Sequence, residues 1–112
     1  MEIHMLQYDK KNRWGGISRP PVDSPHTLIM LFGSSSFIDD SAPIDELIAE
    51  YPQSAVIGCS TAGEIFGTQI FDESLSVAIL RFAHTEIRTS YALAETGENS
   101  FAAGQQIAQQ LN

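Results

Sequence analysis

The sequence predicts a single α/β domain, with a mixed β-sheet of about four to five strands covered by two helices. The first observation is a set of apolar runs of strand length at residues 27–31, 55–58 and 75–82. Each run has Gly, Ser or Asp close to at least one of its two ends, which is typical of buried strands. The second is that apolar residues recur at helical spacing in two other segments. The third is the length, because 112 residues suffice for one hydrophobic core.

Residues 1–26 have the least regular pattern. The apolar positions within 2–8 indicate a short edge strand. The Lys, Gly and Pro residues that follow break both helices and sheets. We therefore expect an edge strand and a Pro/Gly-rich leader over 1–26, ahead of a domain spanning 27–112. Trp14, in this leader, is expected to tether it to the sheet edge or to form part of a partner surface.

The first helix is predicted between the first two firm strands. Asp40 and Ser41 can cap it, and Pro43 stands in its first turn, where a missing N–H does least harm. The apolar positions that follow at helical spacing are Ile44, Leu47, Ile48 and Tyr51. Strands joined through one helix are usually parallel. The first two strands are therefore predicted to be parallel neighbours, and the second, around Ile57, to be the most buried.

After the loop 63–72, the third strand is predicted to turn at Ala83-His84 into an antiparallel fourth strand. In that strand, alternate apolar and hydroxyl side chains share one face: Ile87, Thr89, Tyr91 and Leu93. Ser100 can then cap a final helix. Its predicted packed face consists of Phe101, Gly104, Ile107, Ala108 and Leu111. The sheet is therefore expected to be mixed.

Serine-rich segments follow the first two firm strands, where Leu31-Phe32 runs into Gly33-Ser34-Ser35-Ser36 and Val56-Ile57 into Gly58-Cys59-Ser60-Thr61. Parallel strands place both loops at the carboxyl edge of the sheet, where open α/β sheets usually hold ligands. Hydroxyls and glycine N–H groups suit a small polar ligand. The candidate ligand-binding residues are Gly33, Ser34, Ser35, Ser36, Gly58, Cys59, Ser60, Thr61, Gly63 and Glu64.

The acidic residues Asp39, Asp40 and Glu64 beside these loops disfavour a phosphate ligand but suit an amine. A zwitterion such as an amino acid satisfies both halves of such a site. The alternative is that the small residues only allow tight turns and helix caps.

The two serine-rich junctions resemble a known family when four further runs are added. These runs are Ile38-Asp39-Asp40, Gly67-Thr68-Gln69, Ser74-Leu75-Ser76-Val77-Ala78 and Phe101-Ala102-Ala103-Gly104. Together they are similar to the amino-terminal part of the FIST domain, from about Thr27 onward. The resemblance implies a bacterial, intracellular sensory domain that binds small ligands without catalysis. It also implies a signalling partner such as a histidine kinase, a cyclase or a chemoreceptor.

FIST regions are longer than this chain, so the resemblance also implies that one sheet edge is left bare. Exposed strand edges pair readily with other chains, and we expect a homodimer or a larger homo-oligomer.

A hydrolase is one alternative function. Gly58-Cys59-Ser60-Thr61-Ala62 is similar to a relaxed nucleophile elbow, with Ser60 or Cys59 as nucleophile. An activated serine needs a positioned base. His4, His26 and His84 are the only histidines, and no spacing brings any of them to Ser60. Binding is therefore the better interpretation, and we expect no enzymatic activity.

The second alternative is haem, which rests on the resemblance alone, because some FIST-like proteins are haem-binding nitric-oxide sensors. His84 or His4 would supply the axial ligand. The spacing of the three histidines and one cysteine indicates no metal site. We therefore expect no cofactor in the main interpretation.

Composition excludes other classes of partner. Fourteen acidic residues against six basic ones give a net charge of −8. Nucleic acid and anionic membranes are bound through clustered Lys and Arg, so neither is expected as a partner. The single cysteine fits a reducing compartment, and no apolar run approaches the length of a membrane span. We expect a cytoplasmic protein.

Overall fold

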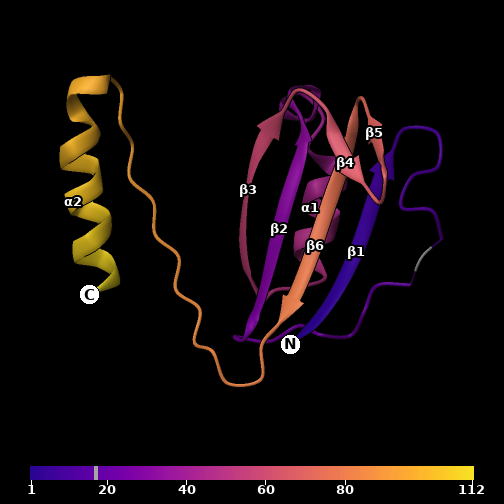
Figure 1. Cartoon of the computed structure of the whole chain (residues 1–112), viewed down its shortest axis with the longest axis horizontal. Coiled ribbons are helices and arrows are strands. Elements are labelled where there is room, and N and C mark those ends of the chain that lie inside the picture. The colour runs from indigo at the N-terminus through magenta and orange to yellow at the C-terminus, as the bar shows by residue number, and fades with distance from the viewer. Residues whose placement is uncertain (17) are drawn as a thin grey trace.

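The computed structural model describes residues 1–16 and 18–112 (Figure 1). Its strands are β1 (Glu2–Asp9), β2 (Thr27–Ser34), β3 (Ala55–Thr61), β4 (Glu64–Phe66), β5 (Gln69–Phe71) and β6 (Ser74–Arg81). Its helices are α1 (Ala42–Ala49) and α2 (Ser100–Leu111), with short 3₁₀ turns η1 (Ser35–Ile38) and η2 (Gly97–Asn99). The predicted α/β class is confirmed. No helix among the described residues is long and apolar enough to cross a membrane.

The main sheet has four strands in the order β1-β6-β2-β3. β2 and β3 are parallel, as predicted from the helix between them. β6 is antiparallel to both β1 and β2, so the sheet is mixed. The prediction of an antiparallel strand after Ala83-His84 is wrong, because residues 85–94 form no strand. The edge strand β1 takes the place beside β6 instead.

The hydrophobic core lies on one face of this sheet, under α1, which is behind the sheet in Figure 1. Its members from the sheet are Leu6, Tyr8, Ile29, Leu31, Leu75, Val77 and Ile79. The members from outside the sheet are Trp14, Val22, Phe37, Leu47 and Tyr51. Residues of the predicted leader thus pack in the same core as the rest of the chain. Trp14 is buried and contacts Tyr8, with 5.2 Å between ring centroids, as the tethering interpretation expected.

Within residues 1–16 and 18–112, no helix covers the opposite face of the main sheet (Figure 1). The second predicted helix exists as α2, but it lies apart from the sheet and none of its residues is buried. Its predicted packed face therefore makes no core contact. β3 was expected to be the most buried strand, yet it lies at the edge of the sheet, and the Ile57 side chain is 41% exposed. β6 lies inside the sheet and is more deeply buried.

Both serine-rich junctions are more regular than the sequence suggested. β2 continues through Gly33 and Ser34, and β3 continues as far as Thr61. Ser35 and Ser36 begin the 3₁₀ turn η1. The segment 63–72, predicted as a loop, contains the hairpin of β4 and β5, which turns at Gly67 with a φ of +62°. The carboxyl ends of the parallel strands are therefore closed by a 3₁₀ turn and a small hairpin.

Candidate functional site

The two serine-rich junctions lie side by side, as the sequence predicted. Gly33 pairs with Ser60, and Ser34 with Thr61, at the carboxyl ends of β2 and β3. A hollow of about 230 Å³ lies here. Its lining consists of Leu31, Gly33, Ser34, Phe37, Ile38, Ile44, Cys59, Ser60 and Leu75. This lining is mainly apolar and holds no charged group, so it lacks partners for the two charges of a zwitterion.

Several of the predicted ligand-binding hydroxyls already have partners within the protein. The Ser34 hydroxyl accepts hydrogen bonds from the Ser36 N–H and from its hydroxyl, at 3.3 and 3.0 Å, and so caps η1. Thr61 Oγ1 donates to the buried carboxylate of Glu64, at 2.7 Å. Ser34 and Thr61 therefore agree with the alternative that these small residues form turns and caps and do not bind a ligand. Ser35, Cys59 and Ser60 are exposed, and Gly63 lies near the base of the hairpin.

The histidines lie away from Ser60. His4 Nε2 is 2.7 Å from Glu2 Oε1, on β1, at the other edge of the sheet from β3. His26 Nδ1 is 2.8 Å from the Thr85 carbonyl oxygen. His84 is exposed in the turn that follows β6. Among the described residues, no three His, Cys, Asp or Glu side chains come together as a metal site.

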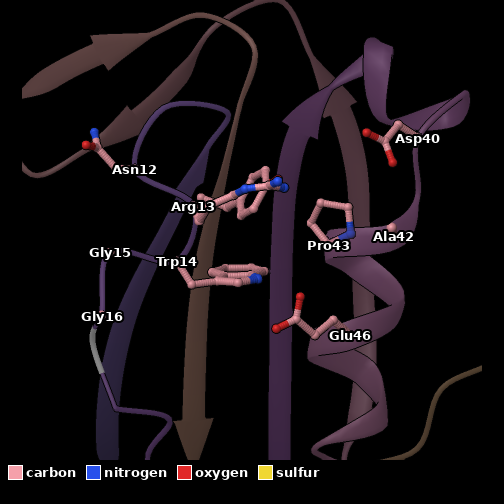
Figure 2. A pocket seen from close by; sticks show the side chains of 10 residues that line it. Asn12, Arg13, Trp14, Gly15, Gly16, Asp40, Ala42, Pro43 and Glu46 are labelled. Atoms are coloured by element: carbon pink, nitrogen blue, oxygen red, sulfur yellow. The ribbon is translucent and has the colours of Figure 1, made fainter.

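A larger cavity, of about 420 Å³, lies between the loop after β1 and the amino-terminal half of α1 (Figure 2). Its lining consists of Tyr8, Asn12, Arg13, Trp14, Gly15, Gly16, Asp40, Ala42, Pro43 and Glu46. We call it the Arg13 cavity. It falls in the size range of about 300–1,000 Å³ that is usual for small-molecule sites.

The loop that carries Arg13 is fixed by Asp9. The backbone N–H groups of Lys11 and Asn12 donate to Asp9 Oδ1, at 2.9 and 2.6 Å. These bonds, above all the one from Asn12, hold the pKa of the Asp9 carboxyl below its ordinary value. Arg13 N donates to the Asp9 carbonyl oxygen at 2.8 Å. Arg13 itself has a φ of +54°, which is uncommon for a residue with a side chain and points to a built turn.

The Arg13 cavity has charges of opposite sign on its two sides. The Arg13 side chain points from the loop toward α1, and the carboxylates of Asp40 and Glu46 point back toward the loop (Figure 2). Arg13 Nη1 donates to the Tyr8 hydroxyl at 3.0 Å, and this bond raises the Arg13 pKa, with smaller contributions from Asp40 and Glu46. No ion pair joins Arg13 to either carboxylate among the described residues. The opposite charges therefore face one another across the cavity.

Trp14 forms the floor of the cavity. Its indole Nε1 is buried and has no hydrogen-bond partner among the described residues, and the nitrogen-bearing edge of the ring points toward α1 (Figure 2). The Arg19 guanidinium stacks over the Trp14 ring, with its central carbon 4.3 Å from the ring centroid. Arg19 also contacts Glu46 and Glu50, at 3.6 and 3.3 Å. An unpaired buried N–H costs free energy, so a ligand that accepts a hydrogen bond from it gains affinity.

This cavity was not predicted from the sequence. Its loop side was interpreted as a leader, and of its lining only Asp40 was considered as a ligand contact. The available signal was the cluster Asn12-Arg13-Trp14-Gly15-Gly16, which combines a cation, an indole and two glycines directly after a strand.

Residues 27–112 match the family model described as the FIST N domain. The chain belongs to the FIST N domain family. The suspected resemblance is thereby confirmed, and this FIST N domain is a sensory and signalling domain. Comparison with curated proteins and with solved structures gives no significant match. The matched region includes Asp40 and also α1 with Glu46, whereas Arg13 and Trp14 precede it.

Proposed function

We propose that this FIST N domain is a non-enzymatic, cytoplasmic sensor that binds a free amino acid in the Arg13 cavity. The observation that carries the proposal is the placement of one guanidinium opposite two carboxylates with no direct pairing between them. An α-amino acid carries the complementary charges on two groups bonded to the same carbon atom. Its carboxylate would accept hydrogen bonds from the Arg13 guanidinium, and its ammonium group would donate to Asp40 or Glu46.

The neutral groups of the cavity support the same ligand class. Trp14 Nε1 offers a further donor to a carboxylate. The faces of Trp14 and Pro43 supply apolar surface for a side chain. A phosphate or a dicarboxylate would meet Asp40 and Glu46 as like charges, which disfavours both ligand classes. Binding of the amino acid would then be transmitted to a signalling partner, such as a histidine kinase, a cyclase or a chemoreceptor.

The test is a thermal-shift and calorimetric screen of the proteinogenic amino acids. For any hit, two analogues are measured beside it: the amine that lacks the carboxylate and the acid that lacks the amine. Both analogues are expected to bind at least about tenfold more weakly, because each leaves one side of the cavity unpaired. Arg13→Gln and Asp40→Asn should lower affinity for the intact amino acid by a similar factor. Lys11→Gln is the matched control, because Lys11 is a neighbouring cation that does not line the cavity.

If no amino acid stabilises the wild-type protein, or if Arg13→Gln binds a hit as tightly as wild type does, the Arg13 cavity is not an amino-acid site. A Soret band in the purified protein would instead favour the haem alternative through His84 or His4.

A further inference from the structure

The face of the main sheet opposite α1 is mainly apolar, and its one charged residue, Asp9, lies at the end of β1. We call it the open face. By strand alternation its main part consists of Ile3, Met5, Gln7, Leu28, Met30, Phe32, Ala55, Ile57, Cys59, Ser76, Ala78 and Leu80, and the row at the hairpin end consists of Asp9, Ser74, Ser34 and Thr61. One row of this face, Met5, Ala78, Met30 and Ile57, crosses all four strands. Ile3, Met5, Phe32 and Ile57 are among the exposed large apolar residues of the chain. A contiguous apolar patch of this kind usually marks an interface.

The open face also contains a hollow. The β4–β5 hairpin folds over one end of the face and leaves a space of about 350 Å³ beside the sheet. Met5, Phe32, Ile65 and Ala78 supply much of its apolar lining. A large apolar side chain from a partner could therefore be seated between the hairpin and the sheet.

α2 has an apolar stripe whose residues are all exposed. Phe101, Gly104, Ala108 and Leu111 recur at helical spacing, and Phe101 is 76% exposed. No residue from Ser100 to Leu111 is charged. The twelve residues of α2 make a helix about 18 Å long. This is comparable with the distance of about 14 Å across four strands.

The position of α2 indicates that it packs on the sheet of a second copy of the chain and not on its own sheet. Residues 82–96 leave the end of β6 in an extended conformation and run between α2 and the sheet (Figure 1). The Ser90 hydroxyl donates to Gln110 Oε1 and ties the last turn of α2 back to this connector. The connector and α2 therefore form one arm that stands off its own sheet. An extended connector of this length reaches about 50 Å, more than the 43 Å of the longest axis of the molecule.

We propose that two copies of this chain form a symmetric dimer by exchanging these arms, with α2 of each copy packed on the open face of the other. Both surfaces are on every chain, so a two-fold arrangement uses all of them and is closed. Each chain contributes the twelve residues of α2 and about as many from the open face, within the roughly 20–30 residues per side of a stable interface. Phe101 is the side chain expected in the hollow beside the hairpin.

Charge fits this arrangement. The net charge of −8 makes two copies repel one another, but α2 carries none of that charge and the open face carries only Asp9, at the end of β1. Glu64 lines the hollow but is already buried in the single chain. Contact over the apolar part of the open face therefore desolvates no exposed ionised group, and salt screens the remaining repulsion. The dimer should tighten as salt rises, whereas an interface held by ion pairs would weaken.

The first test is the molar mass of the full chain by analytical ultracentrifugation. Wild type is expected to be a dimer, and Phe101→Glu and Ile57→Glu should each weaken dimerisation by about tenfold to a hundredfold. Both side chains are exposed in the single chain, so both variants should fold, which circular dichroism checks. Ile38→Glu is the matched control, because Ile38 is 79% exposed but lies on η1, outside the open face.

The second test distinguishes exchange from closure within one chain. In a Cys59→Ser background, one chain carries Ile57→Cys and another carries Ala108→Cys. Exchange predicts a disulfide between the two chains on mild oxidation. A chain with both substitutions should likewise become linked to another chain. A monomeric wild type, an intramolecular disulfide in that double variant, or an unchanged dimer in Phe101→Glu would each overturn the proposal. None of these outcomes depends on a ligand, so the test is independent of the Arg13 cavity.

Discussion

The Glu64 carboxylate accepts two hydrogen bonds from Ser74, one from its backbone N–H at 3.2 Å and one from its hydroxyl at 2.9 Å. Both residues are buried, and Thr61 donates a third bond to the same carboxylate. Glu64 thus joins the end of β3 to the start of β6 across the base of the β4–β5 hairpin. A carboxylate with three donors is satisfied in place. Glu64, the last residue of the Gly-Cys-Ser-Thr-Ala-Gly-Glu segment, therefore stabilises the fold and is not free to bind a ligand.

Glu64→Ala should therefore destabilise the domain by about 1–3 kcal/mol, because it leaves the Ser74 N–H unpaired in the interior. Glu64→Gln should cost less, since its amide oxygen can still accept from Ser74 and its amide N–H can donate to Thr61. Urea unfolding of both variants measures the difference. Equal losses for the two substitutions would mean that the charge, not the hydrogen-bond geometry, is what matters here.

Local sequence patterns predicted the elements but not where they end. Apolar runs and one helical repeat were enough for β2, α1, β3 and β6, and for the parallel pairing of β2 with β3. The runs seemed to end at Gly33 and Gly58 because glycine and serine usually break strands. In the fold, Gly33 pairs with Ser60 and Gly58 pairs with Leu31, and this pairing compensates for weak intrinsic strand propensity.

The segment around Ile87 to Leu93 shows the opposite error. Its alternation is as clear as that of β1, but a strand exists only where its backbone finds a partner. β1 arrives from the other end of the chain and occupies the place beside β6, a long-range choice that no local pattern records. The Arg13 cavity was unpredictable for a similar reason. It depends on the left-handed backbone of Arg13, which brings the loop to face α1.

Two glycines on β2 and β3 should respond differently to the same substitution. An alanine Cβ at position 33 would lie 2.4 Å from Leu75 Cδ2, and one at position 58 would lie 2.1 Å from the Leu31 carbonyl oxygen. A side-chain tip can move, whereas a backbone atom in the sheet cannot move without separating the strands. Gly33→Ala should cost about 1–3 kcal/mol, and Gly58→Ala should cost more.

The control for this pair is Gly97→Ala, because a Cβ at Gly97 meets nothing within 4 Å. Thermal melts of the three variants should rank Gly97→Ala near wild type and Gly58→Ala lowest. If Gly58→Ala had the same melting temperature as wild type, the register between β2 and β3 described above would be wrong.

Acid should loosen the Asp9 loop. The folded-state pKa of Asp9 lies below the ordinary value of 3.8, chiefly because of the Asn12 N–H. Asp9 therefore contributes stability that is fully present above the unfolded pKa and is lost as the pH falls through the folded value. Asp9→Asn removes this dependence while keeping an acceptor oxygen. The stability difference between wild type and Asp9→Asn should stay constant at neutral pH and shrink as the pH falls through and below the ordinary value of 3.8. A difference that does not change with pH would contradict the assignment.

Ser60→Ala separates the two candidate ligand sites. Ser60 is exposed at the end of β3, so the substitution should change the free energy of unfolding by no more than about 0.5 kcal/mol. If a ligand binds between the serine-rich junctions, loss of one hydrogen bond of about 0.5–1.5 kcal/mol, or up to ~3 with a charged partner, lowers affinity roughly threefold to a hundredfold. If the ligand binds in the Arg13 cavity, Ser60→Ala leaves affinity unchanged while Arg13→Gln reduces it. We expect the second result, because the hollow at Ser60 has no charged group in its lining. Calorimetric titration of one amino-acid hit into wild type and both variants decides between the sites, and a loss of affinity in Ser60→Ala alone would return the site to the serine-rich junctions.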